Sequence, residues 1–202
     1  MIARIYQLCE WIMKLFLLNV LWIGFTLIGF GVFGFFPATV AMFQLIMDWM
    51  NKKDTKMVTT FWNSYKSNFL KSNKMGLVIV LIGSILITDL QFFHRYDTLV
   101  FKVLYLMNLS MLLFYVVNCL YIIQTFNHFN VNTYQYFKYA ILIGITNPIK
   151  TIMIIITFIL SSLVFLIYPG LFIMFGGSGI ALIMVFITKS NFANLKGVVI
   201  NS

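Results

Sequence analysis

Acidic residues, cysteines and histidines are scarce in this sequence of 202 residues, which holds five Asp and Glu, two Cys and two His. Charged side chains of either sign make up 9% of it, whereas hydrophobic residues make up 61%. A domain of this length has no interior large enough to hide so much apolar surface, so lipid must replace water around much of the chain. The composition therefore predicts a multi-pass membrane protein.

The scarcity of acidic residues, cysteines and histidines also limits the reactions that the chain could catalyse. Two cysteines do not make a disulfide framework, and a buried thiol is the simplest interpretation of Cys119, which lies in an apolar segment. No Cys/His cluster, zinc-protease motif, nucleophile elbow or phosphate loop occurs. His94 and His128 are expected on opposite sides of the membrane, too far apart to share a metal. We therefore expect no catalytic residue, no metal and no cofactor, and predict that the protein is not an enzyme.

Basic residues are present in excess and give a net charge of +9. Because they flank apolar segments, they favour the headgroups of anionic lipids as partner and not nucleic acid. Four clear apolar segments have the length of a membrane span. They are Met75 to Phe93, Leu99 to Ile123, Lys150 to Tyr168, and Leu171 to Thr188.

Residues 15–47 carry no charged side chain and have an awkward length. One helix of that length would run for about 50 Å, well beyond a hydrocarbon core of about 30 Å. Gly29, Gly31 and Gly34 favour a turn, after which Val32 to Met50 returns as a second helix with Pro37 near its start. The alternative is one tilted helix kinked at Pro37, with residues 38–50 along the interface. The chain thus has five or six spans.

Two connecting segments, 51–74 and 126–148, are amphipathic. In the first, Phe61, Trp62, Tyr65 and Phe69 share one helical face among six lysines, which is typical of a helix in the headgroup region. Lys and Arg counts place both segments and the C-terminus in the cytoplasm of a bacterium. Two early crossings leave 12 positive residues inside and 2 outside, against 10 and 4 for one crossing.

We therefore predict an all-α fold: a single integral membrane domain over 1–202, with helical hairpins at about 11–50, 75–123 and 149–188. Short stretches also resemble a known family. "LNVLW" (18–22), "GVFGFFPATVAMF" (31–43) and "TFWNSYKSNFLKSNKMG" (60–76) are similar to the YesL-like family of bacterial multi-pass membrane proteins. The matched positions are Asn19, Trp22, Gly34, Pro37, Ala38, Thr39, Phe61, Trp62, Tyr65, Asn68 and Phe69. The resemblance implies no catalytic residues, and it implies a genomic setting beside carbohydrate ABC importers and two-component regulators.

Polar side chains at membrane depth are the other candidate functional residues. Asn19 and Asn118 are expected within spans, where they either join helices through hydrogen bonds or line a solute site. Pro37 is a candidate hinge. Asp89 either pairs with Arg95 or Lys102 at the interface or contributes with Asp97 to an external polar pocket. The "GGSG" at 176–179 favours close helix packing over a broken-helix binding site, with Gly177 and Ala181 suitably spaced.

Our leading hypothesis is an accessory or regulatory membrane protein that contacts the membrane subunits of a carbohydrate ABC importer or of a sensor kinase. The alternative is a small carrier or channel for an uncharged solute. The stretch 60–74 is the main candidate for partner or lipid contact, either as a topological anchor or as a docking helix. The residues concerned are Phe61, Trp62, Tyr65, Lys66, Phe69, Lys71 and Lys74.

Overall fold

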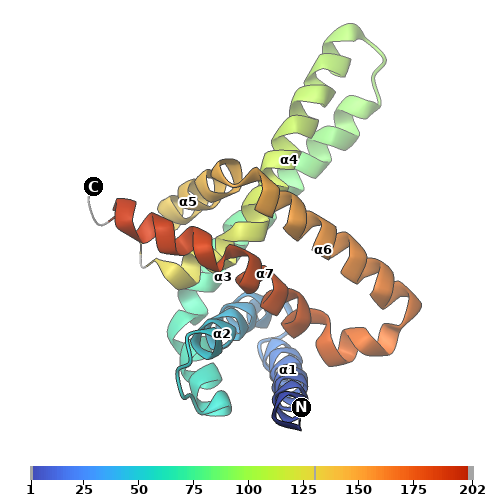
Figure 1. Cartoon of the computed structure of the whole chain (residues 1–202). Coiled ribbons are helices and arrows are strands. Elements are labelled where there is room, and N and C mark those ends of the chain that lie inside the picture. Colours follow the sequence, from blue (N-terminus) through green and yellow to red (C-terminus); the bar gives the residue numbers. More distant parts are fainter. Residues whose placement is uncertain (1, 130, 200–202) are drawn as a thin grey trace. The chain divides into compact units, whose positions relative to one another are not determined.

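The structure, a computed structural model, describes the backbone of residues 2–129 and 131–199 and the side chains of residues 5–129 and 131–189. These residues form seven helices and no strand, which confirms the predicted all-α class (Figure 1). All but α5 are long and apolar enough to cross a membrane. The helices are α1 (Ile2–Ile28), α2 (Val32–Met50), α3 (Met57–His94), α4 (Leu99–His128), α5 (Thr133–Thr146), α6 (Pro148–Ile167) and α7 (Pro169–Val199). The side chains of Arg4 and Lys196, which enter the charge count, lie outside the described residues.

The helices gather into two compact units. The first holds the residues up to Leu70 and those from Asn147 onward, and the second holds Lys71–Thr146. Helix α3 contributes its first part to the first unit and the remainder to the second. The sequence predicted one integral domain and showed no boundary between such units.

A tight turn separates α1 from α2, as the glycines predict. Phe30 and Gly31 both take positive φ values, 57° and 73°. A Cβ on Gly34 would overlap the carbonyl oxygens of Phe25 and Thr26, so only glycine lets the second helix start this close to the first. The two helices run antiparallel, because Trp11 meets Trp49 edge-on at 6.1 Å at their other ends.

Helix α2 forms the core of the first unit. Twelve of its 19 residues are buried, a far larger share than in any other long helix. Small residues such as Ala38 and Ala41, both fully buried, let neighbouring helices approach its backbone. Both α1 and α7 pack against it, and α6 packs against α7.

Helices α6 and α7 form a hairpin whose turn is at Tyr168, and Pro169 is the first residue of α7. Phe165 and Phe172 pack edge-on across this hairpin at 5.5 Å. The break falls where the sequence places it, because Pro169 cannot donate the hydrogen bond that would continue α6.

The second unit is built on α4. Tyr115 of α4 donates a hydrogen bond to the Ile79 carbonyl of α3 at 2.9 Å, and Gly83 leaves room for its ring. Figure 1 shows α4 and the part of α3 from Lys71 onward as a helical hairpin, here called the arm, whose tip is the 95–98 turn. At the other end of α4, Gly144 of α5 lies against Val117 and Tyr121.

One predicted boundary differs from the structure. The amphipathic segment 51–74 is not separate from the span that begins at Met75, because α3 continues unbroken through both. Similarly, the segment 126–148 contains the end of α4, a short connection and α5. Their predicted location in the cytoplasm stays a prediction.

Candidate functional site

Asn19 joins α1 to α7 through a buried amide. Its Nδ2 donates to the carbonyl of Ile173 at 2.7 Å and lies 3.4 Å from that of Phe172. Its Oδ1 accepts from the backbone N–H groups of Gly177 at 2.9 Å and Ser178 at 3.1 Å. In a regular α-helix the Gly177 N–H pairs with the Ile173 carbonyl, so Asn19 contacts both groups of one helical hydrogen bond. The amide has two donors and two acceptor positions, and all are engaged.

Glycine allows a close approach where α7 meets this amide. A Cβ on Gly177 would lie 3.1 Å from Trp22 Cε3 and 3.2 Å from Asn19 Oδ1, closer than a side chain normally packs. Ala181, one turn further along α7, is also buried. The "GGSG" stretch therefore serves close helix packing, the favoured of the two interpretations of the sequence.

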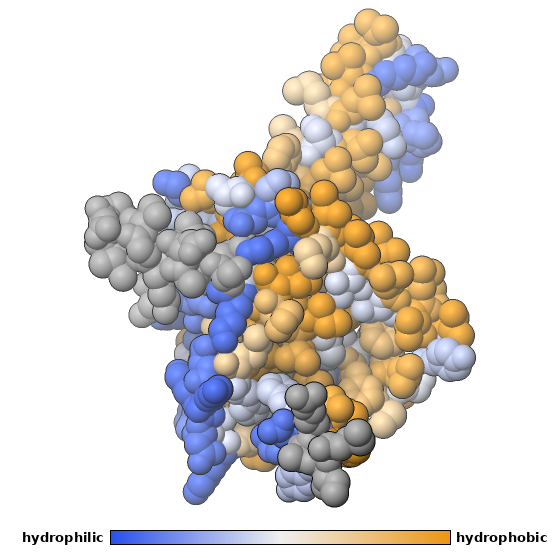
Figure 2. Space-filling model, viewed as in Figure 1, coloured by the Kyte–Doolittle hydropathy of each residue, from blue (hydrophilic) through white to orange (hydrophobic). Residues whose placement is uncertain are grey.

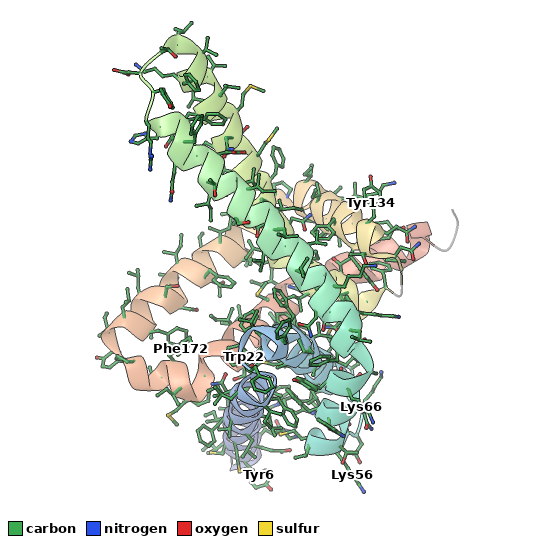
Figure 3. The ribbon with its side chains drawn as sticks, turned by 180° about the vertical axis from the view of Figure 1, so that it is seen from behind. Tyr6, Trp22, Lys56, Lys66, Tyr134 and Phe172 are labelled. Atoms are coloured by element: carbon green, nitrogen blue, oxygen red, sulfur yellow. The ribbon has the colours of Figure 1, made fainter. Side chains whose placement is uncertain are left out.

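Trp22 extends the junction to α2. Its indole N–H donates to the Thr39 hydroxyl at 3.0 Å, and that hydroxyl donates to the Phe35 carbonyl at 2.7 Å. Figure 3 shows Trp22 beside Phe172 at the meeting of these helices. We call Asn19, Trp22, Thr39, Gly177 and Ser178 the Asn19 junction. The Ser178 hydroxyl is fully buried in it and has no hydrogen-bond partner.

Pro37 lies inside α2 and is buried. It is the sixth residue of the helix, so the Phe33 carbonyl receives no helical hydrogen bond from it. The sequence predicts Pro37 near the start of this helix, where the missing N–H of proline does least harm. In the structure Pro37 lies just beyond the first turn, two residues before Thr39.

The aromatic face of α3 packs on α1. The ring of Phe25 lies 5.1 Å from Phe61, 5.6 Å from Trp62 and 5.2 Å from Tyr65, and the Tyr65 hydroxyl donates to the Phe25 carbonyl at 3.3 Å. We call these four residues, with Phe69 against Tyr65, the Phe25 cluster. Phe61 and Tyr65 are buried, whereas Trp62 stacks on Tyr65 and is 45% exposed.

The place of this cluster bears on the predicted topology. Phe25 is near the turn that ends α1, about 21 Å along the helix from Trp11. The six-span prediction puts that turn outside the cell and residues 51–74 inside it. A contact between Phe25 and Phe61 does not fit both assignments if α1 and α2 cross the whole membrane. Accessibility of residues 51–74 from each side of the membrane therefore tests the six-span topology.

The remaining predicted residues are dispersed. Asn118 Nδ2 donates to the Phe137 carbonyl at 3.0 Å and joins α4 to α5, while its buried Oδ1 has no partner. Asp89 is half-buried; the structure records no ion pair for it, and Lys102 pairs instead with Asp97 at 2.7 Å. That pair borders a cleft of about 360 Å³ at the tip of the arm, together with His94 and aromatic rings but without Asp89. Lys66, Lys71 and Lys74 are exposed.

Sequence reasoning missed a charged site at the end of α2. Asp48 is 6% exposed and accepts from Lys53 Nζ at 2.9 Å and from Gln44 at 3.3 Å. At the same end of the unit, Lys14 lies over the Trp49 ring at 6.0 Å. The spacing of Gln44 and Asp48, four apart on a predicted helix, was the available signal.

Metal ligands do not cluster in the part of the chain that is described: no three His, Cys, Asp or Glu side chains there are placed to hold an ion. The polar groups that do meet, at the Asn19 junction and between α4 and α5, are amides and hydroxyls bonded to backbone. Their arrangement suits helix association.

Six long apolar helices, of which α1 and α7 are joined by a buried amide bonded to backbone, define a helical multi-pass membrane protein. The chain belongs to the YesL-like family, as the resemblance implies. The family described as "Protein of unknown function, DUF624" matches residues 15–90. This range includes Asn19, the glycine turn and the Phe25 cluster, whereas Gly177 lies outside it.

Three proteins of Bacillus subtilis (strain 168) are similar. The uncharacterized protein YesL is 30% identical over 191 residues, which cover 91% of this chain and 86% of YesL. The uncharacterized protein YesV is 29% identical over 191 residues, 93% of this chain and 91% of YesV. The uncharacterized protein YteU is 34% identical over 148 residues, 71% of this chain, and the match spans only 65% of YteU. No solved structure matches the chain.

Proposed function

We propose that the protein is an accessory or regulatory component of the bacterial cytoplasmic membrane, with its C-terminus in the cytoplasm. It works by contact with other membrane proteins and not by catalysis. Its partners are the membrane subunits of a carbohydrate ABC importer or of a sensor kinase that controls one. The genomic setting that the family resemblance implies supports this choice of partners.

The saturation of Asn19 is the observation that carries the proposal. A residue that binds a solute needs a donor or acceptor left for it, and every hydrogen-bonding position of this amide is engaged by α7. The Asn118 amide also donates to backbone, although its Oδ1 has no partner among the described residues. Polar side chains at membrane depth are thus used to associate helices, which favours contact over conduction.

Surfaces suited to partner helices remain. In α6 only Thr151 and Ile154 are buried, and Figure 2 shows an apolar surface along this helix. On α3, Trp62 presents an exposed ring that is fixed from behind by Tyr65, the arrangement of an aromatic anchor in a binding site. We assign partner docking to Trp62 and lipid or helix packing to α6.

Affinity purification from the native host in mild detergent tests the proposal. The tagged chain is expected to recover importer or sensor-kinase subunits, and Trp62→Ala to recover markedly less of them. Tyr134→Ala is the matched control, because Tyr134 is also an exposed aromatic residue but lies on α5, outside the Phe25 cluster. Recovery of the chain without such subunits in several detergents would contradict the proposal.

A carrier for an uncharged solute is the second candidate. The buried Ser178 hydroxyl without a partner favours it, because such a group gains from a polar ligand. Uptake of a broad panel of sugars into proteoliposomes separates the candidates: flux above that of empty vesicles, lost in Ser178→Ala, would support the carrier. An absence of flux for every sugar would contradict the carrier and leave contact with other membrane proteins as the function.

A further inference from the structure

A cleft of about 440 Å³ in the second unit has lysines on one wall and the first turn of α5 on the other. Lys71 and Lys74, three residues apart, lie on one face of α3. Phe126 and Tyr136 form the floor with their rings 5.0 Å apart, and both are nearly inaccessible. The cleft thus combines a buried apolar base with an exposed basic wall.

The charge of the cleft is of one sign. None of the residues that line it is acidic, and the two lysines are exposed at its mouth. On the facing wall Gln135 accepts the Asn132 N–H at its Oε1, at 3.2 Å, which leaves the amide's two N–H donors for a ligand. Thr133 adds a hydroxyl. Two ammonium groups facing neutral donors match a compact anion with several oxygens, such as a phosphate.

The position of the cleft along α3 indicates which kind of phosphate suits it. Lys74 is the last charged residue before the apolar run from Met75 to Thr88, so the cleft opens where the chain enters the hydrocarbon. Headgroup phosphates lie at that depth. We propose that this cleft binds the phosphate group of an anionic phospholipid, with Lys71 and Lys74 as cationic contacts and Gln135 as a neutral donor. The assignment does not depend on the function proposed above.

Lipid binding to the full chain in neutral detergent micelles, followed by native mass spectrometry, tests it with phosphatidylglycerol as the probe. Each lysine near an anionic surface contributes about 1 kcal/mol, so Lys71→Gln with Lys74→Gln should weaken binding about 30-fold. Arg at both positions should retain binding, because the charge is kept. Lys56→Gln with Lys66→Gln is the matched control: it removes one charge from the same helix and one from the residue just before it, both outside the cleft, and binding should stay within about twofold of the wild type.

Three results would overturn the proposal. Equal losses in the two double Gln variants would mean that only net charge attracts the lipid. An unchanged affinity in the variant of the cleft would place the lipid elsewhere. Inorganic phosphate that binds as tightly as phosphatidylglycerol, and displaces it, would make the cleft a site for the free ion. Circular dichroism of each variant confirms that loss of the lysines has left the helices intact.

Discussion

Replacing Asn19 by Leu should separate α7 from α1 more than any other single change of a polar residue. The substitution keeps the side chain's size and removes contacts at 2.7, 2.9 and 3.1 Å. Interhelical hydrogen bonds in membranes are worth about 0.6 kcal/mol on average and up to about 1.7. Three such bonds give about 2 kcal/mol. The Gly177 N–H and Ile173 carbonyl keep each other as helical partners in the variant, which lowers the cost, so we expect a net loss of about 1–2 kcal/mol in the free energy of unfolding.

Unfolding by SDS of the protein in mixed micelles, followed by circular dichroism, measures the free energy of unfolding. Asn118→Leu is the matched control, because this amide donates one interhelical bond, at 3.0 Å, and its Oδ1 has no partner among the described residues. Its loss should cost about 0.6 kcal/mol or less. A cost for Asn19→Leu no larger than for Asn118→Leu would refute the view that Asn19 holds α7 through its backbone.

The remaining predictions use paired variants and the same unfolding assay except where stated. Gly177→Ala should cost about 1–3 kcal/mol through the crowding with Trp22, whereas Gly179→Ala, with its nearest atom at 3.6 Å, should be neutral or stabilising. Asp48→Ala should cost about 1–3 kcal/mol because Lys53 and Gln44 lose a buried acceptor, and Asp97→Ala should change little because its ion pair is exposed. Phe30→Cys, in a chain whose Cys9 is Ser, should react with an impermeant maleimide from outside intact cells; reaction only after permeabilisation would contradict the two early crossings.

The hairpin at residues 29–31 was predictable because backbone chemistry alone determines it. Gly29, Gly31 and Gly34 lie within six residues, and one of them takes a positive φ. The unbroken α3 was harder to predict for the opposite reason. A helix continues through a change of polarity as long as no cap, proline or unfavourable residue stops it, and nothing at Lys74 does so. Apolar periodicity locates membrane depth, not the ends of helices.

Only part of the candidate site could be predicted from the sequence. An amide within an apolar span is conspicuous, so Asn19 could be singled out from its own neighbourhood. Its partners at Gly177 and Ser178 lie 158 and 159 residues away, and no local pattern connects them. Asp48 was overlooked because it stood at the edge of the charge-free stretch and served only to mark where that stretch ends. Its burial depends on how closely α1 and α7 surround α2, which only the tertiary structure shows.

In the first unit, polar side chains hold helices together or brace them through their backbone groups. Asn19 binds the backbone of α7 at its glycines, and Tyr65 donates to the Phe25 carbonyl beside the turn. Thr39 donates to the Phe35 carbonyl next to Pro37. In hydrocarbon no water is present to satisfy a polar side chain, so each of these side chains must bond to backbone or to another side chain. These residues therefore have a structural reason to be polar, and a function by contact must be sought on the outer surface, at Trp62 above all.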